Sequence, residues 1–279
     1  MDSAVFWRKA RRAALLVVMA VVGLTFLYPL VYTLITSTKS NQEIFTNPFG
    51  MPQVWSLASY VKAWTDMNLQ RYFLNSVVLT VGAMAFHLLF GTMAAYAIAR
   101  FDQRLIKAVG GYLALGMMIP IQAILIPIVR MAVSWGASNQ LWFLLCVYIA
   151  GGLPSTVFIV SAYLRTFPGE LEEAAIVDGC GPWRFFWWIL VPVSRPIIVT
   201  MGIISFISTW NELMVAMVLI SDNNLKTLPL GLLNFTGAYS TDYAGLCAAV
   251  IITIIPTLVL YLAFQESVEK GLSEGAVKG

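Results

Sequence analysis

Few residues of this chain have the types and spacing that catalysis requires. His87 is the only histidine, which excludes a histidine-based metal cluster and leaves one candidate base for a nucleophile–base pair. Cys146, Cys180 and Cys247 form no Cys-x-x-Cys or His-Cys pattern, so they predict neither a disulfide framework nor a metal site. No Gly-x-x-x-x-Gly-Lys-Ser/Thr sequence is present, so the chain does not itself cradle the phosphates of ATP. We therefore predict no catalytic residue, no metal ligands and no cofactor in this polypeptide.

Acidic side chains gather in one stretch, residues 170 to 192, the longest charged interruption between apolar runs. Pro168 and Gly169 precede it, and its first residues would place three carboxylates in the first turn of a helix, where they favour the helix dipole. We interpret this group as a helix start at a membrane surface rather than as a carboxylate pair for hydrolysis. The three residues are Glu170, Glu172 and Glu173.

The predicted helix ends at a bend. Gly179 can adopt the left-handed conformation that ends a helix, and Pro182 can begin a second one. Two short helices joined by a glycine predict a docking element, although helix physics alone leaves an ordinary amphipathic surface loop as an equal alternative. With a period of 3.6 residues, Glu173 would point away from the face formed by Leu171, Ala174, Ala175 and Asp178.

The composition places the chain in a membrane. It is 59% hydrophobic and 11% charged, with a mean hydropathy of +0.79, whereas soluble domains carry about 25% charged residues. Six apolar stretches are each long enough to cross a hydrocarbon core of about 30 Å, and none shows strand-like alternation. We expect an all-α integral membrane protein with six transmembrane helices at Ala13–Leu34, Tyr72–Ala99, Ala108–Ala132, Leu141–Leu164, Pro196–Ile220 and Tyr243–Phe264.

The distribution of basic residues predicts the orientation of these helices. Six spans put both termini on one side, and with the N-terminus inside, twelve of the 17 basic residues fall in cytoplasmic segments. Both termini and the stretch at residues 170–192 are therefore expected in the cytoplasm. The formal net charge of +3 is too small to indicate a nucleic-acid partner.

Two ionisable residues fall inside the predicted spans. Glu212, in the triplet Trp210-Asn211-Glu212, would lie within the fifth span, where a charge at the bilayer centre costs about 2.5–3.5 kcal/mol. Asn211 and Glu212 are therefore candidates for a translocation pathway or a subunit interface, and a structural hydrogen bond between helices is the alternative. His87, in the second span, is interpreted as a neutral packing residue.

The order and spacing of Glu173-Ala174-Ala175, Gly179 and Pro192 match the EAA loop of bacterial ATP-binding-cassette (ABC) importer permeases. The similarity continues from about Tyr72 to Gly279, and the sequence resembles the smaller permeases of maltose-type sugar importers. The resemblance implies a type I ABC-importer permease fold, in which this loop is a coupling helix in a cleft of a separate ATPase. The residues it implies for ATPase coupling are Glu173, Ala174, Ala175, Asp178, Gly179 and Pro192.

The C-terminal residues carry a second part of the resemblance. Composition alone predicts a frayed tail. In the maltose-type permeases, however, a similar ending inserts between two ATPase subunits, and the residues so implied are Gly275, Ala276, Val277, Lys278 and Gly279. The corresponding domains are residues 1–71 (first helix and outer segment), 72–264 (permease core with coupling loop 165–195) and 265–279 (cytoplasmic tail).

The resemblance also implies the partners and the cargo. It implies a second permease subunit, two copies of an ABC ATPase that bind ATP and Mg²⁺, and an extracytoplasmic sugar-binding protein, all serving sugar uptake across a bacterial cytoplasmic (inner) membrane. Three alternatives stay open at this point. They are an importer permease for a polyamine or amino acid, a secondary transporter, and a membrane scaffold that binds an ATPase without translocating anything.

Overall fold

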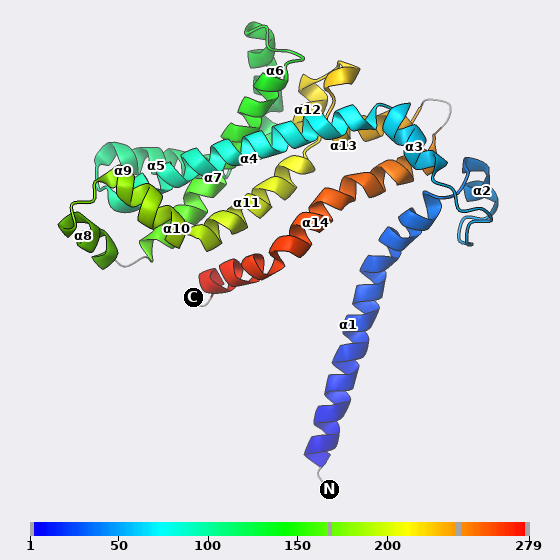
Figure 1. Cartoon of the computed structure of the whole chain (residues 1–279), viewed down its shortest axis with the longest axis horizontal. Helices are drawn as coiled ribbons and strands as arrows, with labels where there is room; N and C mark the ends of the chain where they lie inside the picture. The colour runs from blue at the N-terminus through cyan, green and yellow to red at the C-terminus, as the bar shows by residue number, and fades with distance from the viewer. Residues whose placement is uncertain (1–2, 167–168, 238–240, 277–279) are drawn as a thin grey trace. The chain divides into compact units, whose positions relative to one another are not determined.

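The computed structural model describes the backbone of residues 3–166, 169–237 and 241–276 (Figure 1). Within these ranges the chain is helical, and the only extended pairing is an isolated antiparallel bridge between Thr236 and Thr241. The expectation of an all-α protein is confirmed.

The chain divides into two compact units, which we describe separately. Unit one comprises residues 1–69 and 232–254. Its helices are α1 (Ser3–Thr36), α2 (Asn41–Thr46), α3 (Ala58–Thr65), the 3₁₀ helix η3 (Leu233–Phe235) and the first part of α14 (Tyr243–Ala276).

Unit two comprises residues 70–231 and 255–279 and contains the stretch singled out above. Its longer helices are α4 (Leu69–Arg100), α5 (Arg104–Gly116), α6 (Ile121–Ser134), α7 (Leu141–Arg165) and α11 (Arg195–Trp210). The shorter elements are α8 (Glu170–Val177), α9 (Pro182–Phe185), the π-helix η1 (Phe186–Leu190), α10 (Val191–Val193), α12 (Met214–Leu219), the 3₁₀ helix η2 (Asn223–Leu225) and α13 (Leu228–Leu232).

Four helices in the described part of the chain are long and apolar enough to cross a membrane unbroken. They cover Trp7–Thr36, Leu69–Arg100, Leu141–Arg165 and Tyr243–Gln265. Two further helix pairs qualify only as bent spans, Arg104–Gly116 with Ile121–Ser134 at 106° and Pro182–Val193 with Arg195–Trp210 at 75°. Four of the six predicted spans therefore correspond to unbroken helices, and the third corresponds to the first bent pair. The fifth shares only residues 196–210 with the second bent pair.

Two of the predicted boundaries need correction. The stretch predicted as one helix at Ala108–Ala132 is broken, because α5 ends at Gly116 and Pro120 is the extended cap that begins α6. Proline fixes its own φ and disfavours the helical conformation in the residue before it, so the bend falls where the sequence places Pro120. The stretch predicted at Pro196–Ile220 is likewise divided, since α11 ends at Trp210 and α12 begins at Met214.

Small residues let α4 and α7 pack closely in unit two. A Cβ atom added at Gly91 would lie 2.6 Å from Cγ2 of Thr156, and one added at Gly152 would collide with the ring of His87. Ala95, one turn after Gly91 in α4, is fully buried. Since lipid gives little hydrophobic drive for helix association, such close backbone approach supplies much of the packing. The small residues of α4 and α7 therefore serve packing.

Candidate functional site

The stretch at residues 170–192, which we call the docking segment, has the two-helix form predicted for it. Gly179 has a φ of +74°, and its N–H donates to the carbonyl of Ile176 at 3.0 Å. The N–H of Cys180 donates to the carbonyl of Ala175 at 2.8 Å. These two bonds form a Schellman motif, which requires a left-handed residue where glycine stands. Pro182 then occupies the first turn of α9.

The inward face of α8 differs from the face predicted for it. Ala175 is only 5% exposed and joins a buried cluster that includes Tyr96, Phe185 and Leu190. Leu171, Ala174 and Asp178, which were expected to share its face, are all exposed. The buried face of α8 is instead formed by Ala175 and by Glu172, three residues earlier and partly buried. The small side chain of Ala175 thus lets α8 approach its own unit.

Glu172 anchors α8 to the end of α4, a contact that the sequence analysis missed. The hydroxyl of Tyr96 donates to Oε1 of Glu172 at 3.0 Å, and Nε of Arg100 lies 3.1 Å from Oε2. The Arg100 and Glu172 side chains are 16% and 23% exposed, so this ion pair is better shielded than a surface pair. The sequence signal that pointed to an anchoring site here is the spacing of Tyr96 and Arg100, which are four residues apart and therefore share one face at the end of a span. It does not identify Glu172 as their partner.

The outward face of the docking segment presents apolar residues beside carboxylates. Ile176 and Val177 are 65% and 86% exposed, and Glu173 and Ala174 are exposed beside them. In α9 and the following π-helix, Trp183 and Trp188 are also exposed. Exposed apolar side chains gathered beside carboxylates are the kind of surface that commonly marks an interaction site. The structure thus leaves Glu173, Ala174, Asp178, Gly179 and Pro192 accessible and buries Ala175.

Pro192 explains the π-helix that precedes it. Proline has no N–H, and its ring clashes with the carbonyl four residues earlier in a regular α-helix. The backbone widens here, because the N–H of Val191 donates to the carbonyl of Phe186, five residues earlier. A bend of 75° separates this segment from α11.

The second predicted site is found at the break between α11 and α12. Glu212 accepts hydrogen bonds from the hydroxyl of Tyr148 at 2.7 Å and from the N–H groups of Val215 at 2.7 Å and Ala216 at 3.2 Å. Its carboxylate therefore ties α7 to the start of α12. Asn211 is exposed, and its Nδ2 donates to the carbonyl of Ile207 at 2.8 Å. The structural hydrogen bond considered as an alternative for Glu212 is present.

A cavity of about 250 Å³ adjoins Glu212 within unit two. His87 forms a hydrogen bond with Ser205 at its wall. Hydroxyl, imidazole and carboxylate groups give this largely apolar cavity a few hydrogen-bond donors and acceptors. No group of three His, Cys, Asp or Glu side chains suited to a metal ion occurs among the described residues. The polar lining includes His87, Tyr148, Ser155, Ser205, Thr209 and Glu212.

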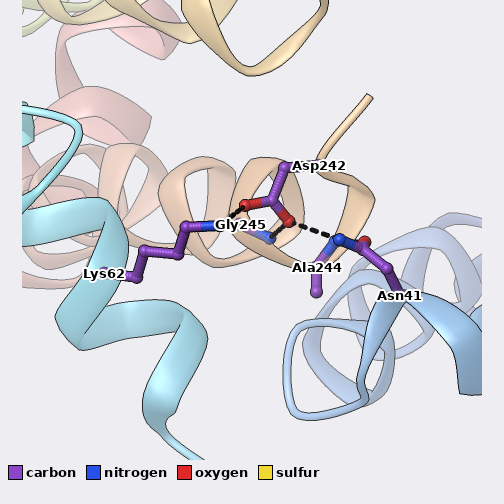
Figure 2. A network of polar contacts seen from close by, with 5 residues as sticks. All are labelled: Asn41, Lys62, Asp242, Ala244 and Gly245. Carbon is purple, nitrogen blue, oxygen red and sulfur yellow. Dashed lines mark hydrogen bonds and ion pairs between the residues drawn. The ribbon is translucent and has the colours of Figure 1, made fainter. Parts of the chain in front are cut away.

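Unit one holds a separate polar cluster centred on Asp242 (Figure 2). Its carboxylate accepts from Nζ of Lys62 and from Nδ2 of Asn41, each at 2.9 Å, and from the N–H of Gly245 at 3.0 Å. Oδ1 of Asn41 accepts in turn from the N–H of Ala244 at 3.0 Å. The cluster therefore ties α2 and α3 to the start of α14.

The cluster shifts the pKa values of its charged members in opposite directions. Burial alone would raise the pKa of Asp242, but the bonds from Lys62, Gly245 and Asn41 together hold that pKa below its usual value. The hydrogen bond to Asp242, and then its charge, raise the pKa of Lys62. A polar cavity of about 740 Å³ lies beside this pair.

The predicted C-terminal site falls largely outside the described residues. Gly275 and Ala276 belong to the last turn of α14, and the structure gives their backbone alone. Val277, Lys278 and Gly279 lie beyond the described ranges.

Comparison with known proteins identifies a family. The profile described as "Binding-protein-dependent transport system inner membrane component" matches residues 87–274, well over half of the chain. The diacetylchitobiose uptake system permease protein NgcG of Streptomyces coelicolor is 33% identical over 270 residues, which cover 95% of this chain and 87% of that protein. The melibiose/raffinose/stachyose import permease protein MelC of Bacillus subtilis is 33% identical over 261 residues, 93% of this chain and 94% of that protein.

Solved structures share the fold. A chain of a bacterial ABC transporter involved in import of the acidic polysaccharide alginate matches with a TM-score of 0.81 and 21% identity. The match covers 95% of this chain and 98% of that chain. A second structure is the alginate ABC transporter in complex with an alginate pentasaccharide-bound periplasmic protein. It matches with a TM-score of 0.70 and 17% identity, and the match covers 92% of this chain and 94% of that chain.

Proposed function

This chain belongs to the family of inner-membrane components of binding-protein-dependent transport systems, and on that premise we propose that it is a permease subunit that moves a sugar or oligosaccharide across the cytoplasmic membrane. The observation that carries the proposal is identity of about one third, along nearly the whole chain, with permeases named for oligosaccharide uptake. The family is one of multi-pass membrane transport components rather than enzymes, in agreement with the prediction of no catalytic activity. The cargo of those relatives favours a carbohydrate over a polyamine or an amino acid.

The partners proposed are a second permease, two copies of an ABC ATPase and an extracytoplasmic binding protein. The exposed apolar and acidic face of the docking segment supports the ATPase contact, because a segment in water leaves such residues uncovered only at a cost. The alginate transporter was solved with a periplasmic protein, which supports a similar partner here. ATP and Mg²⁺ would be bound by the ATPase, and both termini would lie in the cytoplasm with the docking segment.

The mechanism proposed transmits ATPase motion through α8. Ala175 seats α8 in the buried cluster, and Glu172 ties it to Tyr96 and Arg100 at the end of α4. A displacement of α8 would therefore move the end of α4 with it, because the two helices are tied together and the movement is not absorbed by a flexible loop. ATP binding drives this change only if the ATPase surface contacts the two states of the permease differently. Glu173, Ala174, Asp178, Gly179 and Pro192 would face that surface.

Two further parts of the chain receive proposed roles. The cavity beside Glu212 would contribute donors and acceptors to the translocation pathway, with Glu212 held in place by Tyr148. Asn211, exposed at the same break, would face the pathway or the second permease. Residues 275–279 would insert between the ATPase subunits.

Reconstitution tests the proposal. The chain is co-purified with its second permease and ATPase, placed in proteoliposomes with ATP inside, and supplied with binding protein and radiolabelled oligosaccharides. We expect uptake that stops when the ATPase carries a hydrolysis-deficient substitution. Uptake that continues with that ATPase would show a secondary transporter. Binding of the ATPase without uptake of any offered solute would show a scaffold.

A further inference from the structure

We propose that unit two contains a binding site for an anionic phospholipid, in a cavity between the end of α4, α5 and the end of α7. The cavity has a volume of about 580 Å³ and lies at the end of the membrane helices where the docking segment also begins. Figure 1 shows α5, α8 and α9 at this end of unit two. The proposal rests on the chain's place in the membrane and not on the identity of its cargo.

The charge of the cavity fits an anionic headgroup. Three basic side chains line it, Arg100, Lys107 and Arg165, against the single carboxylate of Asp102. Lys107 and Asp102 lie 2.5 Å apart but are 63% and 91% exposed, and an exposed pair of this kind is worth about 0–1 kcal/mol. Lys107 therefore gives up little by contacting a phosphate instead. Arg165 ends α7 and forms no ion pair among the described residues.

The walls of the cavity fit the glycerol and the first part of the acyl chains. Below the charged rim the lining is apolar or small, with Gly110 and Gly111 on α5 and Pro154, Val157 and Phe158 on α7. Gly110 supports the close packing of α5 on α4, since a Cβ atom there would lie 3.2 Å from Cγ2 of Ile98. No atom lies within 4 Å of a Cβ built at Gly111, so this glycine borders open space.

The exterior of α5 supports lipid rather than a soluble anion as the occupant. Leu105 and Tyr112 are 74% and 78% exposed and share a face of α5 roughly opposite Lys107. The outer face of this helix is therefore suited to acyl chains, so the cavity that holds Lys107 lies on a helix that lipid already surrounds. Basic pockets between membrane helices on the cytoplasmic side are the known chemistry for anionic headgroups.

The site also adjoins the docking segment. Arg100 lines the cavity and pairs with Glu172 of α8. A phosphate bound there would add negative charge beside this ion pair, so lipid composition would act on the seating of α8.

Native mass spectrometry of the purified transporter complex, titrated with dioleoyl phosphatidylglycerol in detergent, tests the proposal. The variant Lys107→Gln/Arg165→Gln removes two charges, and each basic residue near an anionic surface is worth about fivefold in affinity, so we expect one phosphatidylglycerol site to weaken by roughly 25-fold. Gly111→Leu should remove the same site by filling it while keeping all its charges. Leucine is a better helix former than glycine, so this variant keeps α5 intact.

Matched controls separate the site from general effects. Arg104→Gln removes a nearby charge that does not line the cavity, and Gly23→Leu adds the same side chain at another glycine with open surroundings. Both should bind as the unmodified complex does. Equal affinity in all variants overturns the proposal, as does equal binding of dioleoyl phosphatidylcholine. Displacement of the lipid by sn-glycerol 3-phosphate at matched concentration would show a soluble-anion site and overturn it as well.

Discussion

Glu172 and Glu173 are neighbours in the sequence but have different surroundings. Glu172 bonds to Tyr96 and pairs with Arg100, whereas Glu173 is exposed. Glu172→Gln keeps an acceptor for Tyr96 but leaves Arg100 without its carboxylate, which should weaken the seating of α8 by about 1–2 kcal/mol. Hydrogen exchange of residues 170–177 should accelerate accordingly in the permease purified without its ATPase. Glu173→Gln is the matched control, and equal acceleration in both variants would contradict the assignment.

The Asp242 cluster makes stability depend on pH at both extremes. The folded pKa of Asp242 is lowered from 3.8, so its contribution is full above that value and is lost as the pH falls through the folded pKa. The pKa of Lys62 is raised from 10.5, so its contribution is full below that value and is lost as the pH rises through the folded pKa.

Asp242→Asn tests this assignment. The substitution should lower stability by about 1 kcal/mol at pH 7, because Lys62 is largely exposed and the pair is screened by solvent. Thermal unfolding of both proteins, measured from pH 7 downward, should show the difference shrinking as Asp242 protonates. A difference that stays constant to the lowest pH would mean that the Asp242 charge contributes nothing.

At the scale of elements, the bend between α8 and α9 depends on one backbone conformation. Gly179→Ala places a side chain at a φ of +74° with no neighbour to clash with, so the cost is backbone strain alone, about 1–2 kcal/mol. We expect faster hydrogen exchange at residues 175–180 and weaker co-purification of the ATPase. Gly181→Ala is the control, since Gly181 also has open surroundings but a φ of −73°. Equal loss of the ATPase in both variants would contradict the prediction, because the loss would then not depend on the left-handed conformation at residue 179.

Parts of the site were predictable because they depend on local sequence. A glycine at residue 179 and a proline at residue 182 specify the end of one helix and the start of the next. The pairing of Glu172 with Tyr96 was not predictable, because the two residues are 76 positions apart and nothing local selects Glu172 over Glu173. The same limit applies to Ala175, whose burial depends on how α8 is seated.

The membrane class followed from composition, but the breaks within apolar runs did not. Hydropathy measures whether a stretch is apolar, and the stretch around Pro120 remains apolar through a bend of 106°. Glu212 was located within a span, whereas its carboxylate accepts from the N–H groups that begin α12. Both departures lie where a proline or a polar side chain interrupts the backbone bonding of an apolar run.

At the scale of the whole molecule, the assembled transporter has two activities that can be measured separately, solute uptake and ATP hydrolysis. Glu173→Ala removes an exposed carboxylate from the face assigned to the ATPase and leaves the contacts of Glu172 intact. If Glu173 pairs with a basic residue of the ATPase in a desolvated interface, its loss should cost about 3–5 kcal/mol. Uptake and ATP hydrolysis measured in the same proteoliposomes should show fewer solute molecules moved per ATP, or loss of the ATPase from the complex. Normal values for both would contradict the role of Glu173.

The central claim is that the docking segment contacts a separate ATPase, and photocrosslinking tests it most directly. Ile176 is 65% exposed on the outward face of α8 and can be replaced by p-benzoylphenylalanine, with Tyr112 on α5, 78% exposed, as the control position. Irradiation of membranes that contain the transport-active complex should join residue 176, and not residue 112, to the ATPase subunit. An active transporter that yields no ATPase adduct at residue 176 would contradict the account.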